Sequence, residues 1–73
     1  MDGREIVEAI RVLEERGLNT KLLRATAVVT WPNGRSETVS LDDLVRLAEI
    51  AQEYSTAGGA VIEAVWRHGN GGR

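Results

Sequence analysis

The turn Trp31-Pro32-Asn33-Gly34-Arg35 constrains the fold of this 73-residue chain more than any other segment, because it fixes how two strands pair. An Asn-Gly pair alone favours a two-residue hairpin turn. Pro32, however, suits the second position of a type I turn that is followed by a left-handed glycine in a bulge. Only the bulged turn places Ala27 opposite Val39, so that the apolar faces of both strands agree. The sequence therefore predicts a bulged hairpin.

Residues 22–31, before the turn, alternate in a way that predicts one long strand. The residues expected to face the core are Leu23, Ala25, Ala27, Val29 and Trp31. The residues expected on the other face are Leu22, Arg24, Thr26, Val28 and Thr30. Because the first set is apolar throughout, the alternation indicates a sheet with one buried face.

Two segments with apolar residues at helical spacing flank the hairpin. The first is expected to begin at Asp2 as N-cap and to end at Gly17, where a left-handed glycine would let Leu18 pack back on the helix. The second is expected to follow Ser40, a good N-cap residue. Two helices are therefore predicted to cover the apolar face of the hairpin.

Residues 60–68 alternate again and predict a last strand. Its expected core-facing residues are Ala60, Ile62, Ala64 and Trp66, and its expected outer residues are Val61, Glu63, Val65 and Arg67. A strand–helix–strand connection is nearly always right-handed, which would place this strand beside the strand 22–31.

The predicted fold class is therefore α+β, a two-layer sandwich with the element order α-β-β-α-β. Its three-stranded, antiparallel-type sheet has the order 2-1-3, and both helices cover one face. Residues 1–68 are expected to form a single domain, and residues 69–73 a flexible glycine-rich tail. A chain this short buries only about 60% of its unfolded surface, so oligomerisation is a natural supplement to its thin core.

The composition excludes most catalytic chemistry within one chain. The sequence has no cysteine and a single histidine, His68, so thiolate and multi-histidine metal sites cannot form. Asp42-Asp43 is explained by the positive end of a helix dipole, and Gly58-Gly59 by helix termination. We therefore predict a protein that is not an enzyme and has no cofactor and no metal ion. An enzyme that uses His68 for acid–base catalysis, with Glu63 as its partner, is a third hypothesis.

The open sheet face is the feature that most suggests a function. Its expected residues are Arg24, Thr26, Val28, Thr30, Val61, Val65 and Arg67. β-Branched residues suit any strand, but three valines together would also form a patch typical of interfaces. The leading hypothesis is a non-enzymatic interaction domain, of the kind found in small bacterial or phage accessory proteins. It would self-associate or bind a protein partner through this face or an edge strand.

The alternative hypothesis is a small nucleic-acid-binding domain that uses Arg24, Arg35 and Arg67. Against it, the face carries no aromatic residue for base stacking, and the net charge is −2. No stretch approaches the roughly 20 apolar residues of a membrane span, and the N-terminus has no apolar run of signal-peptide length. A cytoplasmic protein without membrane contact is expected.

Overall fold

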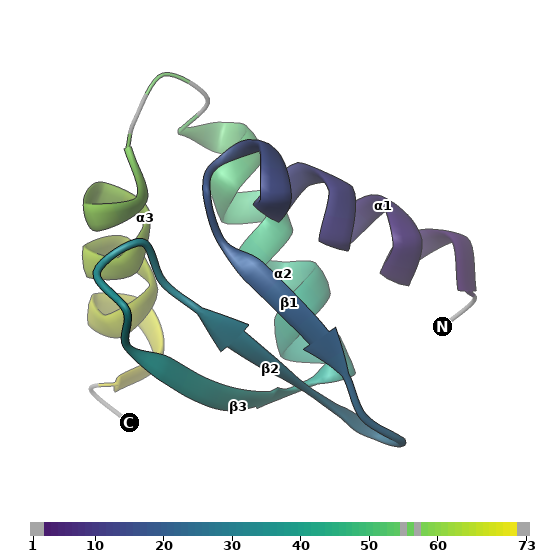
Figure 1. Cartoon of the computed structure of the whole chain (residues 1–73). Helices are drawn as coiled ribbons and strands as arrows, with labels where there is room; N and C mark the ends of the chain where they lie inside the picture. The colour runs from purple at the N-terminus through teal and green to yellow at the C-terminus, as the bar shows by residue number, and fades with distance from the viewer. Residues whose placement is uncertain (1–2, 55, 57, 72–73) are drawn as a thin grey trace.

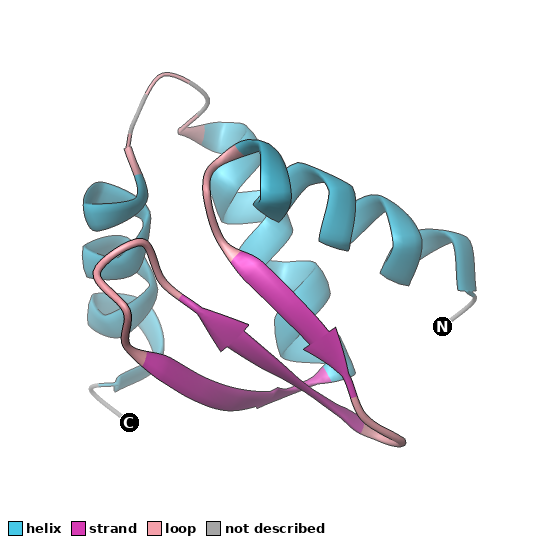
Figure 2. Ribbon diagram, viewed as in Figure 1, coloured by secondary structure: helices cyan, strands magenta, loops and turns pink. Residues whose placement is uncertain are grey.

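The computed structural model describes residues 3–54, 56 and 58–71. The chain folds into an antiparallel three-stranded sheet with helices packed on one side of it (Figures 1 and 2). The elements in chain order are α1 (Gly3–Glu15), β1 (Asn19–Leu22), β2 (Thr26–Thr30), β3 (Ser36–Ser40), α2 (Leu41–Glu53), α3 (Gly59–Trp66) and a π-helical turn (Arg67–Gly71). The predicted α+β class and the covering of one sheet face are confirmed.

The bulged hairpin is also confirmed. The Gly34 amide donates to the Trp31 carbonyl at 2.8 Å, and the Trp31 amide donates to the Arg35 carbonyl at 2.8 Å. Gly34 adopts a φ of +90°, a backbone conformation that residues other than glycine rarely adopt. Ala27 pairs with Val39 as expected, so the turn sets the register of the sheet.

Gly58-Gly59, expected to terminate the second helix, instead begin α3, because α2 already ends at Glu53. Two other predicted helix ends have the expected caps. At the end of α1, the Leu18 amide donates to the Leu13 carbonyl at 3.0 Å, and both side chains are buried. At the start of α2, the Ser40 hydroxyl accepts a hydrogen bond from the Asp43 amide at 3.1 Å. Asp2, the predicted N-cap of the first helix, lies outside the described residues.

The predicted long strand 22–31 is wrong, because the chain reverses within it. β1 ends at Leu22, a turn through Arg24 and Ala25 follows, and β2 begins at Thr26. The Leu23 amide donates to the Thr26 carbonyl at 2.9 Å across this turn. Leu23 and Ala25, expected in the core, are therefore exposed.

The predicted last strand is a helix, and the predicted strand order is wrong for the same reason. Ile62 and Trp66 are buried four residues apart, which is one turn of α3 and not the alternation of a strand. The third strand of the sheet is β1 instead, and the order is β1-β2-β3. The predicted tail has helical structure from Gly69 to Gly71, and residues 72 and 73 lie outside the described range.

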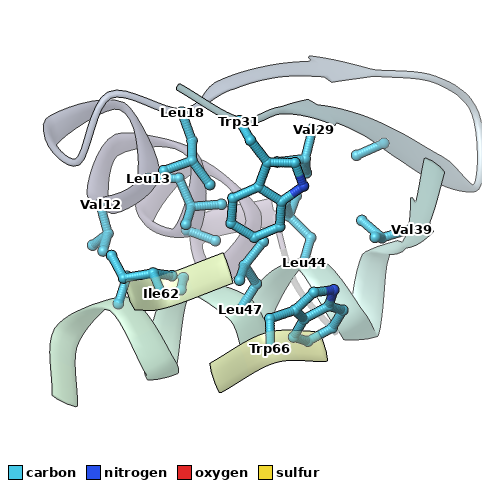
Figure 3. Close-up of a cluster of buried hydrophobic side chains, with 14 of the residues drawn as sticks. Val12, Leu13, Leu18, Val29, Trp31, Val39, Leu44, Leu47, Ile62 and Trp66 are labelled. Carbon is cyan, nitrogen blue, oxygen red and sulfur yellow. The ribbon is translucent and has the colours of Figure 1, made fainter. Parts of the chain in front are cut away.

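The core lies between β2 and the helices, as Figure 3 shows. Trp31, directly after β2, is 1% exposed, and Trp66 of α3 is 4% exposed. The other large, fully buried side chains are Leu13, Leu18, Val29, Leu44, Leu47 and Ile62. Burial of each such side chain stabilises the fold by roughly 1.5–3 kcal/mol, so these contacts hold the layers together. Among the described helices, none has the length and apolar character needed to cross a membrane.

Candidate functional site

The sheet face turned away from the helices is uncovered in the described part of the chain (Figure 2). The strand register and the alternation of side chains place eight residues on it, which we call the open face. They are Asn19 and Lys21 of β1, Thr26, Val28 and Thr30 of β2, and Ser36, Thr38 and Ser40 of β3. The open face is thus rich in hydroxyl groups and carries one aliphatic side chain.

The predicted site residues divide between this face and α3. Thr26, Val28 and Thr30 share the open face as expected, and Arg24 lies at the β1–β2 turn beside it. Val61, Val65 and Arg67 were expected there too, but they belong to α3 and to the turn that follows it. The predicted valine patch therefore does not form, because its two other valines are on a helix.

The charges near the open face are all positive. Lys21 lies on the face itself, opposite Val28, and Arg24 and Arg35 lie in the two turns at opposite ends of β2. The carboxylate of Glu37 points to the helix side, because Glu37 pairs with the core residue Val29. Within the described strands, no acidic side chain shares the open face with these cations.

Hydroxyl groups of neighbouring strands meet across the open face. Thr30 Oγ1 and Ser36 Oγ lie 2.9 Å apart on β2 and β3. Such cross-strand pairs stabilise a sheet by a few tenths of a kcal/mol up to about 1 kcal/mol. The polar surface is therefore part of the sheet's own packing as well as a surface on which donors and acceptors are available.

The outer edge of β3 is the second uncovered part of the sheet. The turn bond between Trp31 and Arg35 sets the alternation of the β2–β3 ladder, so Glu37 and Val39 are the β3 residues whose backbone groups bond to β2. The backbone groups of Ser36 and Thr38 consequently point away from β2. No described element lies along this edge, so these amides and carbonyls remain available for pairing.

A cluster of charged side chains fastens α3 to the β2–β3 hairpin. Arg67 Nη2 donates to Glu63 Oε2 at 2.8 Å and to Glu37 Oε1 at 2.9 Å. Asn33 Nδ2 donates to Glu63 Oε1 at 3.0 Å, and Trp31 Nε1 donates to Glu37 Oε1 at 2.7 Å. The pKa of Arg67 is raised, chiefly by its hydrogen bond with Glu63 and further by the charge of Glu37.

This cluster is better suited to holding the fold than to catalysis. Glu63 is only 7% exposed, and both of its oxygens already accept hydrogen bonds. Sequence reasoning missed its role because it assigned Glu63 and Arg67 to a strand, where they would be too far apart to bond in this way. Their spacing of four residues is the signal for a helical ion pair.

A shallow groove of about 150 Å³ lies between α1 and α2. Its floor is apolar and small, and its rim carries carboxylates; the lining residues are Glu5, Glu8, Ala9, Val12, Val45, Ala48, Glu49 and Gln52. Glu8 on this rim is already paired with Arg11. The groove therefore offers a weakly acidic, mostly apolar depression on the helix side of the molecule.

Residues 3–54, 56 and 58–71 contain no group of three or more His, Cys, Asp or Glu side chains that could hold a metal ion. His68 is exposed in the π-helical turn. The candidate site is consequently the open face together with the outer edge of β3. Comparison of the chain with protein-family models, curated proteins and solved structures finds no match.

Proposed function

We propose that this protein is a small, non-enzymatic interaction domain that binds a protein partner through the uncovered parts of its sheet. The observation that carries the proposal is that the described helices lie on one side, which leaves one face and the outer edges of the sheet available. Sheet edges recruit strands of other chains through backbone hydrogen bonds, and neighbouring side chains provide the specificity.

The hydroxyl-rich character of the open face suits a protein partner with a polar surface. Thr and Ser side chains donate and accept hydrogen bonds, and Val28 supplies an apolar point near the centre of the face. Interfaces of this kind are routinely polar and wet without being weak. Partner binding through the open face would leave the hydrophobic core and the α3 cluster unchanged.

Site-specific photocrosslinking in the native host tests this function. A photoreactive amino acid at Val28 should form covalent adducts with a partner protein. The matched control is Val7, which is 67% exposed on α1, on the helix side of the molecule. Adducts from position 28 alone support binding through the open face, whereas adducts from position 7 alone, or from neither position, would contradict binding through that face.

One observation favours a second candidate, binding of single-stranded nucleic acid by the open face. Lys21, Arg24 and Arg35 line the face and its two ends, where no described carboxylate opposes them. Arg67, part of the original hypothesis, is engaged by Glu63 and Glu37 and does not belong to this set. Binding should weaken steeply with salt, and Lys21→Gln should lower the salt dependence by about one counterion.

Fluorescence anisotropy with short oligonucleotides at low and moderate salt measures both effects. An affinity that is absent at low salt, or that Lys21→Gln leaves unchanged, would remove this second candidate.

A further inference from the structure

The outer edge of β3 lacks two residue types that commonly block strand pairing at an unpaired edge. Its sequence, Ser36-Glu37-Thr38-Val39-Ser40, contains no proline and no lysine, the residues that commonly block edge pairing. Its one charged side chain, Glu37, is turned to the helix side and bonded to Trp31 and Arg67. The Arg67 guanidinium pairs with this carboxylate, so β3 presents no unpaired charge to another strand.

We infer that a second copy of this chain pairs with the outer edge of β3. The two β3 strands would run antiparallel around a two-fold axis at Thr38, and the two three-stranded sheets would become one continuous sheet. This inference rests on the proposed function and names one partner for the sheet edge.

The side chains of β3 are complementary to themselves in this register. Thr38 meets Thr38 of the second copy, and Ser36 meets Ser40 of the second copy, all on the open-face side. On the helix side, Glu37 meets Val39 of the second copy. Like charges directly opposite each other destabilise a strand pair, and this register brings none together.

The outer edge of β1 does not share this property. The outward backbone groups of β1 belong to Thr20 and Leu22, since Lys21 and Asn19 are the residues that bond to β2. The antiparallel register that pairs Thr20 with Leu22 of a second copy places two Lys21 side chains opposite each other. Lys21 therefore protects the edge of β1 by charge repulsion, whereas β3 carries no lysine.

The pairing also leaves the open face of each copy uncovered. A two-fold axis perpendicular to the sheet keeps the helices of both copies on one side and joins the two open faces on the other. A domain of 73 residues has a thin core, and association is one of the few ways in which this cysteine-free chain can supplement it.

Sedimentation of the purified chain over a concentration series tests the inference. The wild type should reach twice the mass of the 8.0 kDa chain. Thr38→Pro removes an outward amide from each copy, which an edge strand tolerates, and should raise the dissociation constant about thirtyfold. Thr38→Lys places two lysines face to face and should raise it about fivefold. Val7→Lys adds the same charge on the helix side, where Val7 of α1 is 67% exposed; it is the matched control and should keep the wild-type mass.

Hydrogen exchange makes the test independent of any variant. The amides of Ser36 and Thr38 should become more protected as protein concentration rises, and the amides of Thr20 and Leu22 should not. Either of two results would overturn the inference: a wild-type chain that stays monomeric at high concentration, or exchange rates of the Ser36 and Thr38 amides that do not change with concentration. The proposed function would survive that result if position 28 still crosslinked to another protein, so the two failures are distinguishable.

Discussion

Gly59 lies against the ring of Pro32, so the first turn of α3 rests directly on the β2–β3 turn. A Cβ atom at Gly59 would be 2.9 Å from Pro32 Cδ and closer still to Cγ. Three residues of α3 and its extension, spaced four apart, face the hairpin: Gly59 contacts Pro32, Glu63 bonds Asn33, and Arg67 bonds Glu37. α3 is thus fitted to the hairpin turn by shape at one end and by charge along its length.

Gly59→Ala should therefore destabilise the protein. We expect a loss of about 1–3 kcal/mol in the free energy of unfolding, because the added methyl group must push the Pro32 ring or the helix away. Urea denaturation measures this loss. Gly3→Ala is the matched control, since Gly3 is likewise the first residue of its helix and a Cβ there meets nothing within 4 Å. Equal stability of the two variants would contradict the close contact.

Gly34→Ala tests a glycine that has space for a side chain but a left-handed backbone conformation, in contrast to Gly59. A Cβ at Gly34 meets nothing within 4 Å, yet the φ of +90° is strained for alanine. We expect a loss of about 1–2 kcal/mol in the free energy of unfolding. Gly34→Asn should lose less, because asparagine tolerates left-handed conformations better. Thermal unfolding of both variants checks the order, and an equal loss in both would argue against a conformational cause.

Glu63→Gln should weaken the attachment of α3. A glutamine offers one oxygen, so either Asn33 or Arg67 would face an NH₂ group where it now has an acceptor. We expect a loss of about 1–2 kcal/mol in the free energy of unfolding, since Glu63 is almost fully buried. The control Glu49→Gln changes an exposed side chain and should stay within about 0.5 kcal/mol. Chemical denaturation that gave both variants the same stability would refute the role of Glu63.

The Glu8–Arg11 pair on α1 should make a small contribution that depends on pH. The pKa of Glu8 is lowered from its ordinary value of 4.5, mainly by the hydrogen bond from Arg11 and further by its charge. A lowered folded-state pKa means that this contribution is present above pH 4.5 and is lost as the pH falls through the lowered value. Both side chains are exposed, so the contribution will be modest.

A carboxyl NMR titration follows the Glu8 pKa directly. Arg11→Gln should raise the titration midpoint of Glu8 towards that of an unperturbed glutamate. Arg35→Gln, on the distant hairpin turn, should leave the midpoint where it is. If the Glu8 titration midpoint is the same in the wild type and in Arg11→Gln, the pair is not formed in solution.

The parts of the fold that the sequence could predict depend on local chemistry. Pro32 and Gly34 specify their turn by their own backbone preferences, and Ser40 specifies a helix start by reaching the amide of Asp43. These signals involve neighbours within a few residues. The structures that these signals specify therefore do not depend on contacts with distant parts of the chain.

The errors arose where the pattern fitted two structures. Residues 60–66 alternate in polarity, and they also place Ile62 and Trp66 on one helical face; a segment of eight residues is too short for periodicity to decide. The β1–β2 turn contains no glycine, proline, asparagine or aspartate, so nothing local marked it. The adjacent Leu22 and Leu23, which interrupt the alternation, were the available sign of a reversal.

The candidate site followed the same division. The position of Thr26, Val28 and Thr30 on the outer face of the sheet was predicted correctly, because the alternation of β2 alone determines it. Two other features depend on where α3 and β1 lie. One is that β3 is an edge strand of the sheet, and the other is that Arg67 does not lie on the open face. Those positions are set by contacts between distant segments, such as Asn33 with Glu63, which no local pattern encodes.

The inward orientation of Glu37 contributes to an electric dipole moment of the molecule. With that carboxylate turned away from the open face, the sheet side presents Lys21, Arg24 and Arg35. On the helix side, α1 and α2 carry eight acidic residues (Glu5, Glu8, Glu14, Glu15, Asp42, Asp43, Glu49 and Glu53) and three basic ones (Arg4, Arg11 and Arg46). Such a charge distribution exerts a torque on the molecule before any contact is made. In the field of a negatively charged body, the protein would therefore rotate to arrive with its sheet in front.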